Sequence, residues 1–265
     1  MHYGHLSSKS VDFFIAGAQK CGTTALDHYL RSHPKIQMAL TKEIHYFDDE
    51  TINWSAPDRG RLKSQFDWSA IDVIRGEATP IYVYWPDALA RIAAYNATAK
   101  LIIGIRHPTY RAFSHWRMET ERGLESLSFE KAVGPEGRRR VQHAPRGAHR
   151  VFSYVERSLY SEQIATMLDL FPREQVYFFR TDQLWREHER IISDVQDFLR
   201  VRKCINQGRR YVVPDDTRAA AHILPAQTRA RLDGLFAEDI QKTAALTKLD
   251  LSDWMNQSYE EAIGL

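Results

Sequence analysis

The sequence predicts an α/β fold in which a mainly parallel β-sheet is covered by helices on both faces. Short apolar segments rich in Ile, Val and Phe alternate along the chain with segments whose apolar residues recur at helical spacing. Strands that alternate with helices favour a parallel sheet with two covered faces. The chain has 265 residues, of which 43% are hydrophobic and 26% charged, which suits one domain with a full core.

The amino-terminal part contains three predicted strands and one helix. Residues 11–16 (VDFFIA) form a short apolar run that favours β-structure, so we expect a buried strand that ends at Gly17. The helix predicted over residues 23–33 has apolar residues on one face and stops before a proline. Residues 35–38 and 71–78 are candidates for the second and third strands.

The middle of the chain has the clearest signals. A helix is predicted over residues 86–96, because a proline occupies its first turn and its apolar residues share one face. Residues 100–105 (KLIIGI) predict a buried strand. Pro108 then begins a helix that continues to about Glu121.

The second half begins with a change in composition. Residues 134–150 are rich in Gly, Pro and Arg, which predicts a mobile basic loop. A helix is expected over residues 158–171, where apolar residues recur at i, i+3, i+4 and i+7. A strand over 175–179 and a helix over 187–199 follow, and roughly the last 40 residues favour helix.

Composition excludes several classes of protein. A formal charge of +2 gives no argument for nucleic acid or membrane-surface binding. No segment approaches the run of about 20 apolar residues that a membrane span needs. Residues 1–10 lack an apolar h-region, so we expect a flexible lead-in rather than a secretory signal. Cys21 and Cys204 form neither a metal-ligand spacing nor a disulfide framework. A single domain over residues 1–265 in the cytoplasm is expected, with the oligomeric state left open.

The sharpest motif is the segment GAQKCGTT at residues 17–24, between a predicted strand and a predicted helix. Glycines let the backbone turn tightly, and helix amino-terminal amides attract an anion. The P-loop of nucleotide hydrolases has the pattern G-x-x-x-x-G-K-[ST]. Here Thr23 stands where that lysine belongs, and Lys20 lies inside the loop instead. The segment predicts a phosphate-binding loop, with a P-loop kinase and an ordinary strand-to-helix turn as alternatives.

A second anion site is predicted at residues 106–114 (RHPTYRAFS). Arg106 follows a predicted strand, at the edge of the sheet where ligands bind in open α/β proteins. Ser114 lies about two helical turns further on, and an arginine fork with a hydroxyl can hold a phosphate. The alternative is an arginine that caps a local turn and a serine that faces solvent.

Together these motifs resemble those of sulfotransferases, in particular the heparan sulfate N- and 3-O-sulfotransferases and similar bacterial enzymes. Residues 17–24 resemble the family's 5'-phosphosulfate loop, and residues 106–114 its 3'-phosphate motif R-x-P-x-x-R-x-x-S. Residues 41–48 (TKEIHYFD) are similar to the segment P-K-E-x-H-F-F-D, and residues 206–211 (NQGRRY) to a late glycine-basic loop. The resemblance covers roughly residues 11–215, and the pair of phosphate motifs is its specific part.

The resemblance implies a P-loop-like enzyme that uses 3'-phosphoadenosine 5'-phosphosulfate (PAPS), releases 3'-phosphoadenosine 5'-phosphate (PAP) and needs no metal. It places the 5' end of the cofactor on the loop and the 3'-phosphate on Arg106 and Ser114. The residues implied to bind the cofactor are Gln19, Lys20, Cys21, Gly22, Thr23, Thr24, Arg106, Ser114, Gly208, Arg209, Arg210 and Tyr211.

Sulfuryl transfer is an in-line displacement that needs a base, a cation at the leaving oxygen and donors for the sulfuryl oxygens. By resemblance, Glu43 is the base and Lys20 stabilises the leaving phosphate. His45 acts as a base or orients Glu43. The alternatives without a catalytic role are a surface ion pair for Glu43, a solvated side chain for Lys20 and a structural role for His45. Contacts with the acceptor are expected from Lys42, Tyr82 and Trp85.

The resemblance breaks at residues 76–80 (GEATP), where Ala78 replaces a second lysine of the heparan-type enzymes. A cation near the reacting oxygen is therefore missing or supplied elsewhere. The acceptor stays open between a hydroxyl or an amine of a glycan, a glycolipid or a small-molecule natural product. The alternatives to a sulfotransferase are a small-molecule kinase and a nucleotide-binding module without catalysis.

Overall fold

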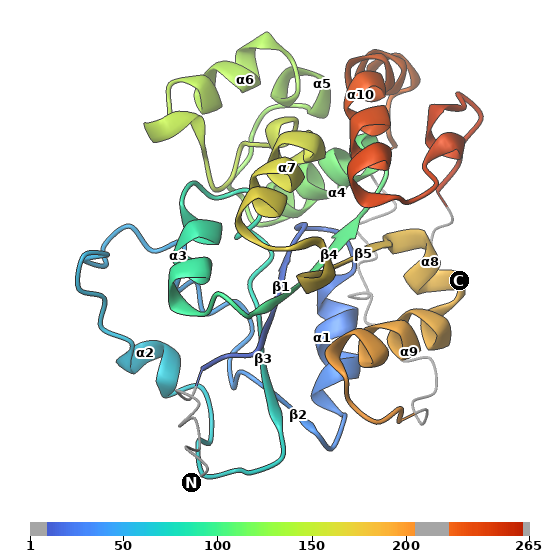
Figure 1. Ribbon diagram of the computed structural model, residues 1–265. Helices are drawn as coiled ribbons and strands as arrows, with labels where there is room; N and C mark the ends of the chain where they lie inside the picture. Colours follow the sequence, from blue (N-terminus) through green and yellow to red (C-terminus); the bar gives the residue numbers. More distant parts are fainter. Residues whose placement is uncertain (1–9, 205–222, 262–265) are drawn as a thin grey trace, which may run out of the picture.

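The computed structural model describes residues 10–204 and 223–261, which form a five-stranded sheet flanked by helices (Figure 1). Every strand pairing is parallel, and the strand order is β2-β3-β1-β4-β5. The prediction of a mainly parallel sheet is thus confirmed, and every strand begins and ends within three residues of its expected range. The strands are β1 (Phe13–Gly17), β2 (Ile36–Met38), β3 (Ile74–Ala78), β4 (Lys100–Ile105) and β5 (Val176–Arg180).

Helices cover both faces of the sheet, because side chains along each strand point alternately to the two sides. In β1, Phe13 and Ile15 belong to one core, and Phe14 and Ala16 belong to the other. The first core packs under α1 (Thr23–Arg31), α8 (Thr181–Arg186) and α9 (His188–Leu199). The second core packs under α3 (Ala88–Tyr95), α4 (Pro108–Glu121), α7 (Tyr160–Leu170) and α10 (Ala226–Thr247).

The segment 134–150 corrects one prediction, because much of it is helical. It contains α6 (Pro135–Gln142) and a 3₁₀ turn, and it follows the short helix α5 (Phe129–Ala132). Its glycine and proline mark the start of a helix, with Gly134 at the N-cap and Pro135 at the first helical position. Arg140 anchors α6 through a 2.7 Å contact with the buried Glu125. The mobility expected of this segment stays a prediction.

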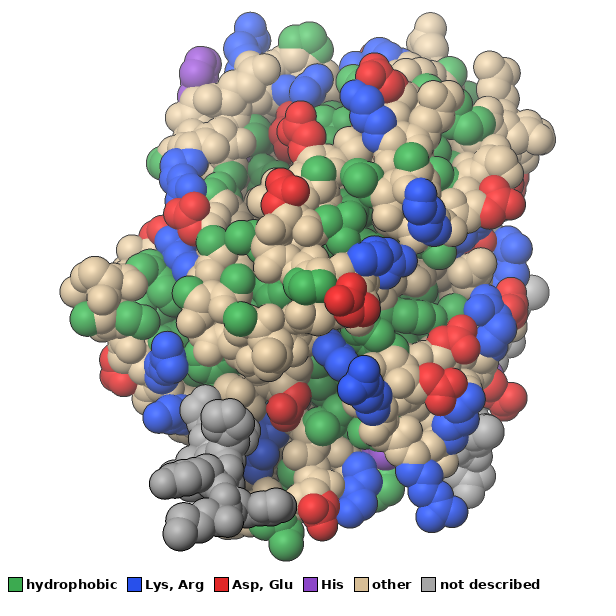
Figure 2. Space-filling view, in the orientation of Figure 1, with side chains coloured by type: hydrophobic (Ala, Val, Ile, Leu, Met, Phe, Trp, Pro, Cys, Tyr) green, Lys and Arg blue, Asp and Glu red, His purple; other side chains and the backbone are tan. Residues whose placement is uncertain are grey.

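The surface mixes charge and apolar groups. Figure 2 shows lysine, arginine and acidic side chains interspersed over one face, as expected for a formal charge of +2. In the portions of the chain that the structure describes, no helix combines the length and the apolar character needed to cross a bilayer.

The topology places a switch point between β1 and its neighbours at the carboxyl ends of the strands. β1 lies at the centre, and the chain passes from β3 on one side of it to β4 on the other. Ligands of open α/β sheets bind at such a switch point. The loop after β1 packs tightly on β4, since a Cβ added at Gly104 would lie 2.7 Å from the Cys21 carbonyl oxygen. The first phosphate motif and Arg106 therefore meet at one edge of the sheet.

Candidate functional site

The loop at residues 17–22 leads from β1 directly into α1. The Ala18 amide donates to the Gly104 carbonyl at 2.8 Å, which holds the loop against β4. Gly22 has φ +80°, a left-handed conformation that strains residues with a side chain. The first turn of α1 contains no acidic residue and no side-chain cap, so its first amides are available to an anion.

The predicted loop residues differ in how much of each side chain reaches solvent. The Thr24 side chain is exposed, whereas those of Thr23 and Cys21 are buried. The Cys21 thiol contacts the Tyr160 hydroxyl at 3.8 Å, and burial raises its pKa. The Cys21 side chain is therefore not available to a ligand from solvent, and a contact between its main chain and the cofactor stays a prediction.

Lys20 is the cation at the mouth of this loop. It has φ +71° and is partly exposed. Burial lowers the pKa of Lys20 to about 8, and nearby Arg106 and Arg122 also lower it. Among the residues that the structure describes, no carboxylate lies within 4.0 Å of its ammonium group. Lys20 is a cation in cationic surroundings, which a bound anion would relieve.

Arg106 lies beside Lys20 but already holds a carboxylate. Its Nη1 donates to the Lys20 carbonyl at 3.3 Å. Its Nε lies 2.8 and 2.9 Å from the two carboxylate oxygens of Glu261, and its Nη2 makes a further contact with the same group. Glu261 is buried and lies 155 residues away in the sequence, so no local signal could have predicted it. Ser114 is partly exposed on α4.

Residues 41–48, the segment predicted to lie on the acceptor side, form a chain of polar contacts. The Glu43 amide donates to the Ala78 carbonyl at 2.9 Å, which fixes residues 41–48 at the end of β3. The Glu43 carboxylate contacts the Lys42 ammonium, and its other oxygen lies 3.8 Å from His45 Nε2. His45 Nδ1 lies 2.8 Å from the buried Asp48 carboxylate. His45 therefore lies between the carboxylates of Glu43 and Asp48.

Arg150 closes this chain at its inner end. Its guanidinium contacts both the carboxylate and the main-chain carbonyl of Asp48. Burial alone would raise the pKa of Asp48, but donors from His45 and Arg150 hold it below its ordinary value. Arg150 also lies 4.2 Å from the ring centre of Trp85. Sequence reasoning missed Asp48 and Arg150, although Asp48 belongs to the quoted motif.

Tyr82 corrects a second prediction, since its side chain is completely buried and cannot meet an acceptor. Its hydroxyl accepts the amides of Tyr46 at 3.1 Å and Phe47 at 3.5 Å. Tyr82 therefore supports the segment that carries Glu43. Trp85 is partly exposed and donates from Nε1 to Glu50 at 2.8 Å. Contacts of Trp85 and Lys42 with an acceptor stay predictions.

Glu77 is a buried carboxyl beneath the same segment. Thr79 donates to it at 2.5 Å, and its second oxygen has no partner in the described part of the chain. Burial raises the pKa of Glu77 from an ordinary value of 4.5 to about 8. The folded state therefore favours the protonated acid at neutral pH.

Glu77→Gln is expected to raise the unfolding temperature at pH 8 by about 2–8 °C and to change it little at pH 4. A raised folded pKa contributes stability that is complete below the unfolded pKa and is lost as pH rises through the folded pKa. The neutral amide escapes this loss. The unfolding temperatures of both proteins between pH 4 and 9 measure this difference. If the two temperatures change in parallel with pH, the raised pKa of Glu77 is refuted.

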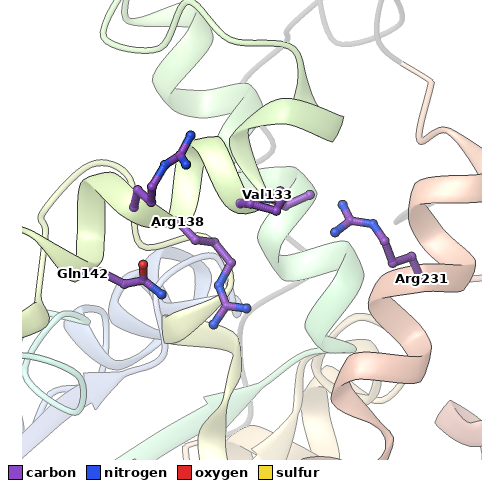
Figure 3. Close-up of a pocket in the computed structure, with 7 residues that line it drawn as sticks. Val133, Arg138, Gln142 and Arg231 are labelled. Atoms are coloured by element: carbon purple, nitrogen blue, oxygen red, sulfur yellow. The ribbon is translucent and has the colours of Figure 1, made fainter.

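A cavity of about 250 Å³ lies elsewhere, between α6 and α10 (Figure 3). Its lining includes no residue predicted for the site, and Arg231 extends toward it from α10. The other lining residues are Val133, Gly134, Pro135, Arg138, Arg139 and Gln142. Gly208, Arg209, Arg210 and Tyr211 lie outside the described residues, so the late glycine-basic loop stays a prediction.

Comparison with known proteins places this geometry in a family. The family model described as "Sulfotransferase domain" matches residues 10–257. A mouse heparan sulfate glucosamine 3-O-sulfotransferase 6 is 29% identical over 205 residues, covering 74% of this chain and 54% of that protein. The membrane-associated sulfotransferase kil1 of Dictyostelium discoideum is 24% identical over 265 residues, covering 71% and 55%. The chain spans about half the length of these curated relatives.

Solved structures agree with this match. The crystal structure of a sulfotransferase from Alicyclobacillus acidocaldarius superposes with a TM-score of 0.78 and 29% identity, covering 94% of this chain and all of that one. The mouse sulfotransferase SULT7A1, solved with PAP, is 15% identical with a TM-score of 0.51, which shows the shared P-loop-like fold alone. Because the family model covers nearly the whole chain, this protein belongs to the sulfotransferase domain family.

Proposed function

We propose that the protein transfers a sulfuryl group from PAPS to an acceptor hydroxyl or amine by in-line displacement. One observation carries the proposal: the Arg106 guanidinium donates to the Lys20 carbonyl, so the residues predicted for the two anion sites are neighbours. A nucleotide with phosphates at both 3' and 5' positions matches such a pair. A kinase loop would instead carry its lysine directly after Gly22.

The other groups supply the remaining chemistry. Glu43 would take the acceptor proton, with His45 orienting it, and Lys20 would stabilise the charge on the leaving phosphate. The loop amides before α1 would hold the 5'-phosphate. The name of the mouse relative, heparan sulfate glucosamine 3-O-sulfotransferase 6, supports a carbohydrate hydroxyl as acceptor. Ala78 stands where the heparan-type enzymes have a second lysine, so a cation near the reacting oxygen is either missing or supplied by another element. A cytoplasmic location stays a prediction.

Thermal unfolding with added nucleotides tests the proposal. PAP, ADP and ATP would each be added with and without Mg²⁺. A ligand at about 100 times its Kd adds about 2.7 kcal/mol, which raises the midpoint of a domain of this size by about 5–10 °C. We expect the rise with PAP alone, unaffected by Mg²⁺. A rise only with ATP and Mg²⁺ would establish a kinase instead.

Arg106→Ala is expected to weaken PAP binding by about 10–100-fold, because a charge-assisted bond to the 3'-phosphate contributes about 1.5–3 kcal/mol. Binding of adenosine 5'-phosphate, which lacks the 3'-phosphate, should change little. Calorimetry with both nucleotides measures the difference. Equal weakening of both would remove Arg106 from the 3' site.

Glu261→Gln is expected to tighten PAP binding by about 3–10-fold, because the wild-type carboxylate competes with the 3'-phosphate for Arg106. Glu260→Gln is the matched control. Glu260 is the neighbour of Glu261 in the sequence, but it contacts Tyr110 and Arg229 rather than Arg106. Unchanged affinity in Glu261→Gln would mean that the carboxylate does not compete.

A further inference from the structure

Arg157 is a buried arginine that contacts the phosphate loop from below. It lies in the 3₁₀ turn Glu156–Ser158 and is 2% exposed. Its Nη1 contacts the Gln19 side-chain oxygen, one residue before Lys20. Its Nη2 donates to the main-chain carbonyls of Arg150 at 2.6 Å and His149 at 3.3 Å.

The charge of Arg157 has no counter-ion. Within residues 10–204 and 223–261, no carboxylate lies within 4.0 Å of its guanidinium, and its Nε is buried without a partner. Arg111, completely buried, donates to the Gln19 carbonyl at 3.4 Å and is likewise without a paired carboxylate there. Burial, followed by Arg111, lowers the pKa of Arg157 to about 10, so the group remains a cation at neutral pH. An unpaired buried charge is costly, so a bound anion would relieve it.

Arg157 also connects the two halves of the site. On one side it holds Gln19 in the donor loop. On the other side it holds the main chain of Arg150, whose guanidinium grips Asp48 and thereby His45. A displacement in line requires donor and base to be fixed relative to each other, because small misplacements lower the rate steeply.

We propose that Arg157 is a positioning residue that fixes the donor loop against the acceptor-side segment, and that its unpaired charge favours the anionic 5' end of the donor. The inference rests on the proposed function. Three features distinguish it from a plain structural arginine. The group has no ion pair, it contacts the side chain next to Lys20, and it meets the segment that orients His45.

Two substitutions separate its charge from its geometry. Arg157→Lys keeps the charge but loses the planar, two-pronged donor geometry of arginine. PAP affinity should therefore stay within about threefold of wild type, while the formation of PAP from PAPS slows by about 10–100-fold. Arg157→Gln loses the charge as well, so PAP should bind about tenfold more weakly. Adenosine 3'-phosphate, which lacks the 5'-phosphate, should bind both variants like the wild type. The rate of PAP formation would be measured with heparan sulfate and with water as acceptors.

Arg75→Lys and Arg75→Gln are the matched controls. Arg75 is also buried, donates to the carbonyls of Asp67 and Ala70 at 2.8 and 2.9 Å, and has an unpartnered Nε. It lies near the amino end of β3, at the edge opposite the loop. These variants should lower the unfolding temperature without changing the ratio of PAP to adenosine 3'-phosphate affinity, or the rate.

The outcomes are distinguishable. A wild-type protein that does not bind PAP overturns the proposed function and this inference with it. A wild type that binds PAP, with Arg157 variants that match the Arg75 variants, overturns the inference alone. Should Arg157→Gln fail to fold, Gln19→Met removes the same contact from the partly exposed loop. Gln19→Met should slow the formation of PAP about tenfold and leave the binding of adenosine 3'-phosphate unchanged.

Discussion

Lys20→Ala is expected to slow the formation of PAP from PAPS by about 10²–10³-fold while weakening PAP binding by less than about tenfold. Negative charge grows on the leaving phosphate oxygen during transfer, and Lys20 is the loop cation without a carboxylate partner in the described chain. Its ammonium should therefore interact more strongly with the transition state than with bound PAPS, whereas the loop amides also hold the 5'-phosphate of bound PAP. Single-turnover kinetics and calorimetry on the same protein measure the two quantities.

A control and a pH profile sharpen this test. Lys20→Arg keeps a cation at the loop. Since the pKa of Lys20 is about 8 in the free protein, kcat/KM should fall as pH rises above about 8. In Lys20→Arg that decline should move to higher pH. A loss of affinity equal to the loss of rate would mean that Lys20 contributes uniform binding only.

Local signals were enough to predict the strands and helices that carry the candidate site. β4 and α4 have the predicted bounds, because an apolar, β-prone run defines the strand and Pro108 marks the start of the helix. The segment 17–24 runs from the last residue of β1 into the first turn of α1, as its glycines predict. The short helix α8 was not predicted, since six residues directly after β5 carry no helical periodicity that can be seen in the sequence.

Long-range pairs could not be predicted in the same way. Glu261 reaches Arg106 across 155 residues, and Arg157 reaches Gln19 across 138, so no spacing pattern relates them. The burial of Tyr82 depends on the packing of two segments that are separate in sequence. Aromatic side chains build both cores and acceptor sites, and composition alone does not distinguish the two.

The ion pair between Lys42 and Glu43 leaves two explanations of Glu43, and they predict different effects. A solvent-exposed ion pair contributes about 0–1 kcal/mol to stability and nothing to a rate. A general base contributes about 10²–10⁴-fold to the rate. Glu43 has one oxygen on Lys42, while the other lies 3.8 Å from a histidine that Asp48 orients. A surface pair requires no such oriented neighbour, so the arrangement favours the base.

Glu43→Gln is therefore expected to fold, to bind PAP within about threefold of wild type, and to transfer about 10²–10⁴-fold more slowly. Glu238→Gln is the matched control, because Glu238 forms an exposed ion pair with Lys242 at 2.7 Å, far from the site on α10. It should leave both quantities unchanged. If Glu43→Gln transfers at the wild-type rate, the surface pair is the correct explanation. His45 then becomes the base to test, since it is the remaining proton acceptor of that chain with an exposed ring.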